Sequence, residues 1–128
     1  MRHDLISDVF TIIKNAEAVG KKECIVPASK LVKSILKVMQ KHEFIGNFEY
    51  IDDGKGGKFR IELLGKINEC KSIRPRFSVK KEDFIKFEKR FLPSFDIGIL
   101  ILTTDKGIID NIEAKEKGIG GKLLGYVY

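Results

Sequence analysis

Six consecutive positions, Ile97 to Leu102, carry only apolar side chains or glycine. A strand of this kind has no polar face to turn toward water, so it belongs in the middle of a sheet, covered on both sides. The polar sequence Thr103–Gly107 follows at once. The pattern therefore predicts a polar loop held at the end of a buried strand. The closing run, Lys122 to Tyr128, predicts a further strand of the same sheet.

The loop Thr103–Gly107 offers groups for binding and lacks a catalytic pair. No histidine or cysteine occurs after Cys70, so this part of the chain has no nucleophile–base pair built from those residues. Two hydroxyls, a carboxylate, an amine and a glycine can instead form hydrogen bonds with sugars, phosphates and base edges. We interpret the segment as a binding loop.

The charge of the chain is positive and unevenly distributed. Its 128 residues include 24 basic and 18 acidic ones, which gives a net charge of +6. The segment from Lys14 to Lys41 contains seven lysines and two acidic residues. The segment from Lys71 to Arg90 contains eight basic residues and three acidic ones. Two windows of this kind favour a polyanionic partner and place the acidic residues elsewhere.

The two cysteines, Cys24 and Cys70, do not form a metal-binding pattern. They lack C-x-x-C spacing, and both histidines, His3 and His42, are distant in sequence. We expect reduced thiols in a cytosolic protein, with no disulfide, no metal and Cys24 packed as a small hydrophobe. No apolar stretch approaches the roughly 20 residues of a membrane span, so no membrane partner is expected.

The first half of the chain predicts the order helix, strand, helix, strand, strand. Apolar residues at helical intervals predict a helix from Asp4 to Ala18, with Asp4 as its N-cap and Gly20 as its stop. A short strand follows at 23–26, and Ser29 is placed to cap a second helix that reaches His42.

The second helix carries its charge along one face. Lys30, Lys33, Lys37 and Lys41 recur at steps of three, four and four residues, opposite the apolar side. A solvated helix face and a surface for an anionic partner are both consistent with this stripe. Because no acidic residue is interleaved, the stripe favours the anionic partner slightly.

A hairpin closes the first half. Residues 48–51 and 59–64 alternate between apolar and polar side chains, as half-buried strands do, and Asp52–Gly57 supplies the glycines of a turn. These glycines are not a phosphate-binding P-loop, because no Lys-Ser/Thr pair and helix follow them.

The character of the sequence changes between Gly65 and Ile73, where we place a boundary between two modules. An extended stretch from Arg74 to Val79 follows. Phe84, Phe87 and Phe91 then predict a short helix with its rings in the core, although their basic neighbours leave base stacking open. Finally, the D-x-x-E pattern starting at Asp110 predicts a short helix that ends near Lys117, with Gly118 after it.

Seven motifs of this chain resemble those of the universal small-subunit ribosomal protein family numbered eight, in family order and at family spacing. They are N-A-E-x-x-G-K-K at Asn15–Lys22, P-A-S-K-L at Pro27–Leu31, V-M-Q-K-H-x-F-I-G at Val38–Gly46, I-D-D-G-x-x-G at Ile51–Gly57, P-R-F-x-V at Pro75–Val79, T-T-x-x-G at Thr103–Gly107 and G-G-K-L-L-G-Y at Gly120–Tyr126. The I-D-D-G, P-R-F-x-V and R-F-L-P-S motifs are similar to the archaeal and eukaryotic branch.

The resemblance implies an α+β fold of two small packed modules: residues 1–68 (helix-strand-helix-strand-strand) and a C-terminal module of residues 69–128 that is mostly β with short helices. It implies a non-enzymatic structural constituent of the cytoplasmic ribosome. Such a protein binds a helix of the rRNA central domain, supports subunit assembly and meets neighbouring ribosomal proteins, with no cofactor or small-molecule substrate. In the family, the T-T-x-x-G loop contacts RNA, and Ser29 and Lys30 would contact the sugar-phosphate backbone.

Residues from the motifs and the basic segments together form the candidate RNA-binding set. Its members are Ser29, Lys30, Lys33, Lys37, Lys55, Arg74, Arg76, Thr103, Thr104, Asp105, Lys106, Gly107 and Lys122.

Two positions depart from the family pattern. Asp105 replaces the usual serine or threonine, and a carboxylate repels phosphate and cannot donate a hydrogen bond, although it can accept one or pair with Lys106. Near the N-terminus, the family's D-P-L becomes Asp4-Leu5-Ile6, which affects the start of the helix only.

Two other functions compete with the ribosomal one. The first is an enzyme that acts on a phosphorylated ligand at 103–107 with Asp105 and Lys106 as acid and base, but no partner group is evident. The second is a DNA-binding regulator that places the 30–41 helix in a major groove. Apart from Gln40, that helix lacks the Arg, Asn and Gln side chains that read bases there.

Overall fold

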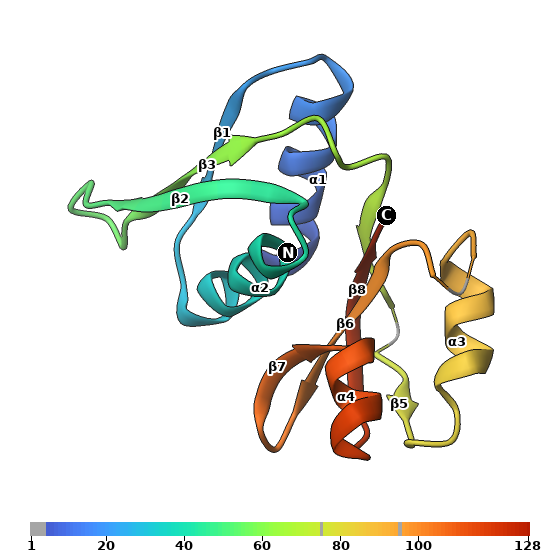
Figure 1. Cartoon of the computed structure of the whole chain (residues 1–128). Helices are drawn as coiled ribbons and strands as arrows, with labels where there is room; N and C mark the ends of the chain where they lie inside the picture. The colour runs from blue at the N-terminus through green and yellow to red at the C-terminus, as the bar shows by residue number, and fades with distance from the viewer. Residues whose placement is uncertain (1–4, 75, 95) are drawn as a thin grey trace. The chain divides into compact units, whose positions relative to one another are not determined.

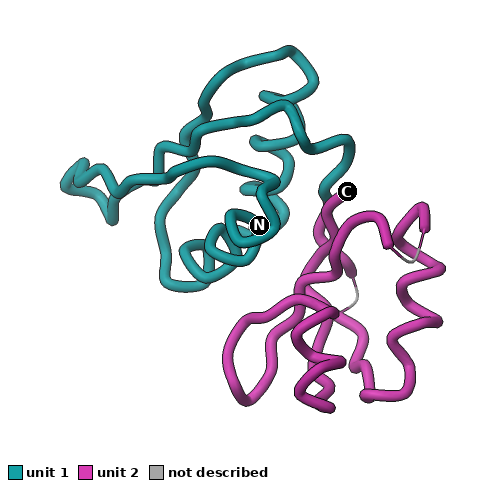
Figure 2. Tube along the Cα trace, in the orientation of Figure 1, with its two compact units in different colours: residues 1–70 teal, residues 71–128 magenta. Residues whose placement is uncertain are grey.

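The computed structural model describes residues 5–74, 76–94 and 96–128 (Figure 1). The chain divides into two compact units, one ending at Cys70 and the other running from Lys71 to Tyr128 (Figure 2). The division falls two residues beyond the boundary expected after residue 68. Each unit combines helices with an antiparallel sheet, which confirms the α+β class.

The N-terminal unit has the predicted order of elements. They are α1 (Leu5–Ala18), β1 (Glu23–Pro27), α2 (Lys30–Lys41), β2 (Ile45–Ile51) and β3 (Lys58–Leu63). The sheet order is β1-β3-β2, with α1 packed on β1 and α2 on β2. Burial alternates along β1 and β3, and the opposed pairs Cys24–Ile61 and Val26–Phe59 are buried. One face of this sheet therefore belongs to the core, and Cys24 packs there as predicted.

Local signals in the sequence explain where these helices begin and end. Ser29 caps α2, because its Oγ accepts a hydrogen bond from the Val32 amide at 3.1 Å. After α1, Gly20 adopts a φ of +74°, a left-handed conformation that glycine tolerates and that stops the helix. Asp4, the predicted cap of α1, lies outside the described residues.

The C-terminal unit is built on a second antiparallel sheet. Its elements are β4 (Cys70–Ser72), β5 (Ser78–Val79), α3 (Phe84–Phe91), β6 (Ile99–Thr104), β7 (Gly107–Asp110), α4 (Asn111–Lys117) and β8 (Gly121–Val127). The strand order is β4-β8-β6-β7, and β5 also pairs with β8. Strand β7 was not predicted. Asp110 caps α4 as expected, with its carboxylate accepting from the Glu113 amide at 2.8 Å, and Gly118 ends that helix.

Strand β6 is the central strand that the apolar run predicted. Leu100 and Leu102 belong to the core cluster, and Ile99 and Ile101 are buried as well, so the strand is covered on both faces. The predicted start was wrong, however. Gly98 has a φ of +86° and breaks the extended conformation, which leaves the Ile97 side chain exposed outside the strand.

Helices α3 and α4 are joined to the sheet by an apolar and a polar contact. Phe84 and Phe87 are buried in the core cluster, so the prediction that these rings pack is confirmed. Glu88 is only 2% exposed. Its carboxylate accepts a hydrogen bond from the Asn111 side chain and pairs with Lys115 at 2.7 Å, while Asn111 accepts from the Leu100 amide of β6 at 3.0 Å.

Candidate nucleic-acid interface

The predicted loop at 103–107 is a tight β-hairpin in the structure. Thr103 and Thr104 end β6, Gly107 begins β7, and Asp105 and Lys106 form the exposed turn between them. The Thr104 hydroxyl donates to the Gly107 carbonyl at 2.8 Å and accepts from the Lys106 amide at 3.0 Å. Thr104 therefore holds the turn in place, and Thr103 is the hydroxyl left on the strand surface.

The Thr103 side chain belongs to a row that crosses four strands. Strand pairing sets Thr103 opposite Ile108 on β7 and Lys122 on β8, and Lys122 opposite Ser78 on β5. Directly opposed side chains project from the same face of a sheet. All four are exposed or half-buried, whereas the next row, which includes Leu102, is buried in the core. We call Ser78, Thr103, Ile108 and Lys122 the hydroxyl–lysine row.

Two glycines bring the strands of this row close together. A side chain on Gly120 would meet the Val79 carbonyl oxygen at 2.1 Å, and one on Gly121 would meet the Thr103 carbonyl oxygen at 2.2 Å. Backbone atoms cannot move aside as a flexible side chain can. The Gly-Gly pair is therefore required by the close approach of β5 and β6 to the start of β8.

In the N-terminal unit, several predicted residues gather at the first turn of α2. Ser29, Lys30 and Lys33 line a hollow of about 280 Å³, whose opposite wall is Tyr50 and Phe59 of the β2–β3 hairpin. Lys30 and Lys33 are exposed, and Lys37 lies one turn further along the same exposed face of the helix. The first turn of a helix also presents unpaired amides, which together with two ammonium groups attract an anion.

Lys55 lies in the turn of the β2–β3 hairpin, near two carboxylates. The Asp52 carboxylate accepts from the Gly54 amide, and that of Asp53 accepts from the amides of Lys55 and Gly57. The hydrogen bonds from these two amides are the main reason that the pKa of Asp53 lies below its ordinary value. Both carboxylates thus shape the turn, and Lys55 remains on its exposed surface.

The other basic candidates lie along the C-terminal unit. Arg74 and Arg76 are exposed in the segment between β4 and β5, upstream of Ser78. On α3, the Arg90 guanidinium lies 4.8 Å from the centre of the Phe77 ring and 5.2 Å from that of Phe91. These rings are therefore engaged by the core and by Arg90, not presented as platforms for bases.

Three glutamates lie on the outward face of the N-terminal sheet. Glu23 and Glu62 are directly opposed across β1 and β3, and Glu49 pairs with Arg60 at 2.8 Å across β2 and β3. Three carboxylates against two cations, Lys58 and Arg60, leave this face with a net negative charge, which repels phosphate. This face is therefore unsuited to a polyanion, in contrast to the α2 side of the same unit.

Comparison with known proteins gives one consistent answer. The family model described as ribosomal protein S8 matches residues 4–128. The chain belongs to this family. It is 55% identical over 129 residues to the small ribosomal subunit protein uS8 of Thermoplasma volcanium, with the whole of both chains covered. It is 52% identical over 126 residues to that of Methanococcoides burtonii, which covers 98% of this chain and 97% of the other.

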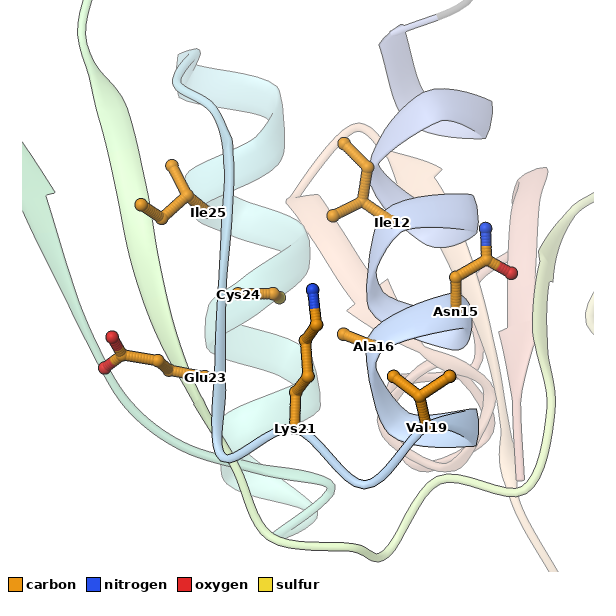
Figure 3. A pocket seen from close by; sticks show the side chains of 8 residues that line it. All are labelled: Ile12, Asn15, Ala16, Val19, Lys21, Glu23, Cys24 and Ile25. Atoms are coloured by element: carbon orange, nitrogen blue, oxygen red, sulfur yellow. The ribbon is translucent and has the colours of Figure 1, made fainter.

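One hollow in the N-terminal unit has a cysteine among its lining residues. This hollow, about 640 Å³, lies between α1 and β1, and Figure 3 shows Ile12 and Ala16 facing Cys24 across it. Burial raises the pKa of the Cys24 thiol to about 11, so the sulfur stays protonated and poorly nucleophilic near neutral pH. The hollow holds no histidine to activate it.

Within residues 5–74, 76–94 and 96–128, no group of three or more His, Cys, Asp or Glu side chains is placed to hold a metal ion. None of the helices in this part of the chain has the length and apolar character that a bilayer crossing requires.

Sequence reasoning missed three residues of these surfaces. Ser78 and Ile108 join the hydroxyl–lysine row through strand pairing, which follows from the fold and not from local sequence. Tyr50 was assigned to an ordinary half-buried strand, yet its side chain is more than half exposed. An aromatic residue next to a glycine-rich turn was the one available signal.

Proposed function

We propose that the hydroxyl–lysine row and the adjoining hairpin turn are the surface through which this S8-family protein binds small-subunit rRNA. In this proposal the chain is a structural constituent of the small ribosomal subunit. It binds a helix of the rRNA central domain and supports assembly of the subunit in the cytoplasm. The observation that carries the proposal is the alignment of two hydroxyls and one ammonium group across adjacent strands of one rigid sheet.

The chemistry of the row suits RNA in particular. An RNA helix has a wide and shallow minor groove that displays 2′-hydroxyls, which both donate and accept hydrogen bonds. Ser78 and Thr103 offer the same dual capacity, and Lys122 lies between them to meet a phosphate. Because the row lies on paired strands, its groups are held in position before the RNA arrives, which lowers the entropic cost of binding.

The two units contribute different contacts under this proposal. The C-terminal unit reads local RNA shape through the row and the 105–106 turn, with Arg74 and Arg76 as nearby phosphate contacts. The N-terminal unit holds the backbone through Ser29, Lys30, Lys33, Lys37 and Lys55. Hydroxyl contacts depend on the shape of the RNA, whereas lysines respond to charge wherever phosphates lie.

The structure weakens the case for a DNA-binding regulator. Gln40 is the one side chain of α2 that is of a base-reading type. Its amide donates to the Gly46 carbonyl at 3.2 Å and lies 3.4 Å from the Asn47 side chain, so it is already engaged within the protein. The lysines that remain recognise phosphate but supply little base discrimination.

Recovery of the protein from cell lysate, with sequencing of the bound nucleic acid, tests the function. One abundant segment of small-subunit rRNA is the expected result, and binding of the purified protein to that segment should then be measured by filter retention. Recovery of scattered DNA would support the regulator instead. A Thr103→Val variant that retains full affinity for the segment would refute the proposed surface.

A further inference from the structure

The hollow beside the first turn of α2 combines a cationic wall with an aromatic one. Lys30 and Lys33 form the cationic side, together with Ser29, the N-cap residue that precedes them. Tyr50 and Phe59 of the β2–β3 hairpin form the aromatic side. At about 280 Å³, the hollow is large enough for one planar heterocycle with its phosphate at the rim.

Tyr50 is held in place but not covered. Its ring meets Phe59 edge to face, with 6.0 Å between centroids, and lies so close to Gly57 that an added side chain there would approach the Tyr50 hydroxyl to 2.2 Å. The residue is nevertheless 57% exposed. Two residues earlier on the same strand, Phe48 also packs edge to face on Phe59, at 5.6 Å, and is only partly exposed. Phe48 is therefore mostly covered by the core, whereas the Tyr50 ring remains in contact with solvent.

The cationic wall has donors to spare. The Ser29 oxygen accepts from the Val32 amide, and a hydroxyl that accepts in this way still has its proton to donate. The ammonium groups of Lys30 and Lys33 project from successive turns on an exposed face. A phosphate bound here would lie beside a flat aromatic surface, which is the arrangement that one nucleotide presents.

We infer that this hollow binds a single unpaired nucleotide of the rRNA, with its phosphate at Ser29, Lys30 and Lys33 and its base stacked on Tyr50. The inference rests on the proposed function, and it specifies the kind of RNA that the N-terminal unit takes. A base within a helix is stacked on both sides and cannot reach the ring, so the nucleotide must come from a bulge, a loop or a strand end. Stacking on an aromatic ring tolerates any base, so the site selects for an unstacked base and not for sequence.

The test uses the 128-residue chain and the rRNA segment that copurifies with it. Tyr50→Ala should weaken binding about tenfold, the low end of what loss of one base–aromatic stack produces, whereas Tyr50→Phe should stay within about twofold of wild type. The matched control is Val19→Ala, an exposed residue of the same unit that follows α1 and lines the separate hollow between α1 and β1, and it should leave the affinity unchanged. Thermal melting verifies that each variant is folded.

Two further measurements identify the ligand. Photocrosslinking of the wild-type complex, read by mass spectrometry, should join Tyr50 to one nucleotide, and chemical probing should find that nucleotide protected by wild type and reactive with Tyr50→Ala. An RNA in which that nucleotide has been deleted should bind wild type and Tyr50→Ala equally. If Tyr50→Ala fails to fold, the crosslink and the deleted RNA still decide the matter with wild-type protein, through loss of affinity on deletion.

The inference is overturned if Tyr50→Ala binds as wild type does, or if its loss is the same on fully paired RNA, which would make Tyr50 a packing residue. It is also overturned if the crosslink joins Tyr50 to a protein segment. Failure of the proposed function looks different, because wild type itself would then retain no rRNA. Weak binding by Thr103→Val with unchanged binding by Tyr50→Ala would uphold the function and refute this site alone.

Discussion

Adjacent residues of the same type have different roles at the tip of β6. Thr103 presents its side chain on the hydroxyl–lysine row, whereas the Thr104 hydroxyl makes two hydrogen bonds within the turn. A family motif that reads T-T treats the two positions alike. The hydrogen bonds of the folded hairpin distinguish them: Thr104 stabilises the turn, and Thr103 is left available for a ligand.

This difference predicts two distinct outcomes for the same substitution. Thr103→Val should weaken binding to the cognate RNA by about 1–3 kcal/mol, because its partner on the RNA is left without a hydrogen bond, and should leave protein stability nearly unchanged. Thr104→Val should lower the free energy of unfolding by about 1 kcal/mol through loss of the turn bonds. Filter binding and urea denaturation of both variants give the comparison. Equal losses of stability would contradict the assignment.

Asp105 stands where the resemblance to the family implies a serine or threonine. Its exposed carboxylate stands in the turn beside Lys106, on a surface that we assign to RNA. Asp105→Ser should strengthen RNA binding, because it removes repulsion from phosphate and restores a donor. Affinity measured at two salt concentrations checks the reason, since the gain should shrink as salt screens the repulsion. Weaker binding by a folded Asp105→Ser variant would show instead that the Asp105 carboxylate contributes to RNA binding, as an acceptor of a hydrogen bond.

The two thiols predict how stability depends on alkaline pH. Burial is the main reason that the pKa values of Cys24 and Cys70 rise from 9.0 to about 11 and about 12. As the pH rises above 9, the thiols of the unfolded chain lose their protons before those of the folded protein do. The free energy of unfolding therefore falls between pH 9 and about 11–12. Denaturation of wild type and of a Cys24→Ala/Cys70→Ala double variant should give a steeper decline for wild type over this range. Parallel curves would argue against buried, protonated thiols.

At the scale of elements, one buried carboxylate joins α3, α4 and β6. Glu88 accepts from Asn111 and pairs with Lys115, and Asn111 continues the contact to the Leu100 amide. Glu88→Ala should lower the free energy of unfolding by about 2–4 kcal/mol, because it leaves a buried amide donor and a nearby ammonium without their partner. Glu116→Ala, which removes an exposed carboxylate from α4, is the control and should change stability by less than about 0.5 kcal/mol.

The same contact marks the limit of prediction from sequence. Caps and turns were predictable, because Ser29, Asp110 and the Asp52–Gly57 turn act within a few residues of their own positions. Strand β7 was missed because it has only four residues, and its form depends on pairing with β6. Glu88 lies on a helix whose other charges are exposed, and nothing nearby indicates that Asn111, 23 positions later, will meet it.

The candidate site follows the same division. The polar turn after β6 was predictable from the end of an apolar run, and so were the lysines at helical spacing on α2. The row was not, because Ser78, Lys122 and Thr103 come from three strands brought together only by the sheet. Tyr50 was missed for a different reason. The alternation in β2 predicted which face of the sheet carries Tyr50. It did not predict that α2 leaves the Tyr50 side chain uncovered.

Across the whole molecule, charge is separated into a cationic and an acidic surface. The lysines of α2 lie on an exposed helix face, and the outward face of the N-terminal sheet carries Glu23, Glu49 and Glu62. A net charge of +6 therefore understates the positive field on the α2 side of the N-terminal unit. The acidic face gives the protein an orientation, since it is repelled by the same phosphates that the lysines attract.

This separation predicts that the position of a charge matters more than its number. If about four to six phosphates are neutralised, the logarithm of affinity should fall with the logarithm of salt at a slope between about −3 and −5. Lys33→Ala/Lys37→Ala should reduce that slope by about 1.5 and weaken cognate and unrelated RNA together.

A charge-matched pair makes the comparison decisive. Lys58→Ala/Arg60→Ala takes two positive charges from β3, so both double variants have a net charge of +4 instead of +6. The β3 variant should keep the wild-type slope, because Arg60 pairs with Glu49 and Lys58 acts on the Asp53 carboxylate, so neither cation is assigned to phosphate. Filter binding across a salt series, for both variants and wild type, measures this directly. Equal slopes for the two variants would mean that RNA senses only the total charge, and the oriented surface would have to be abandoned.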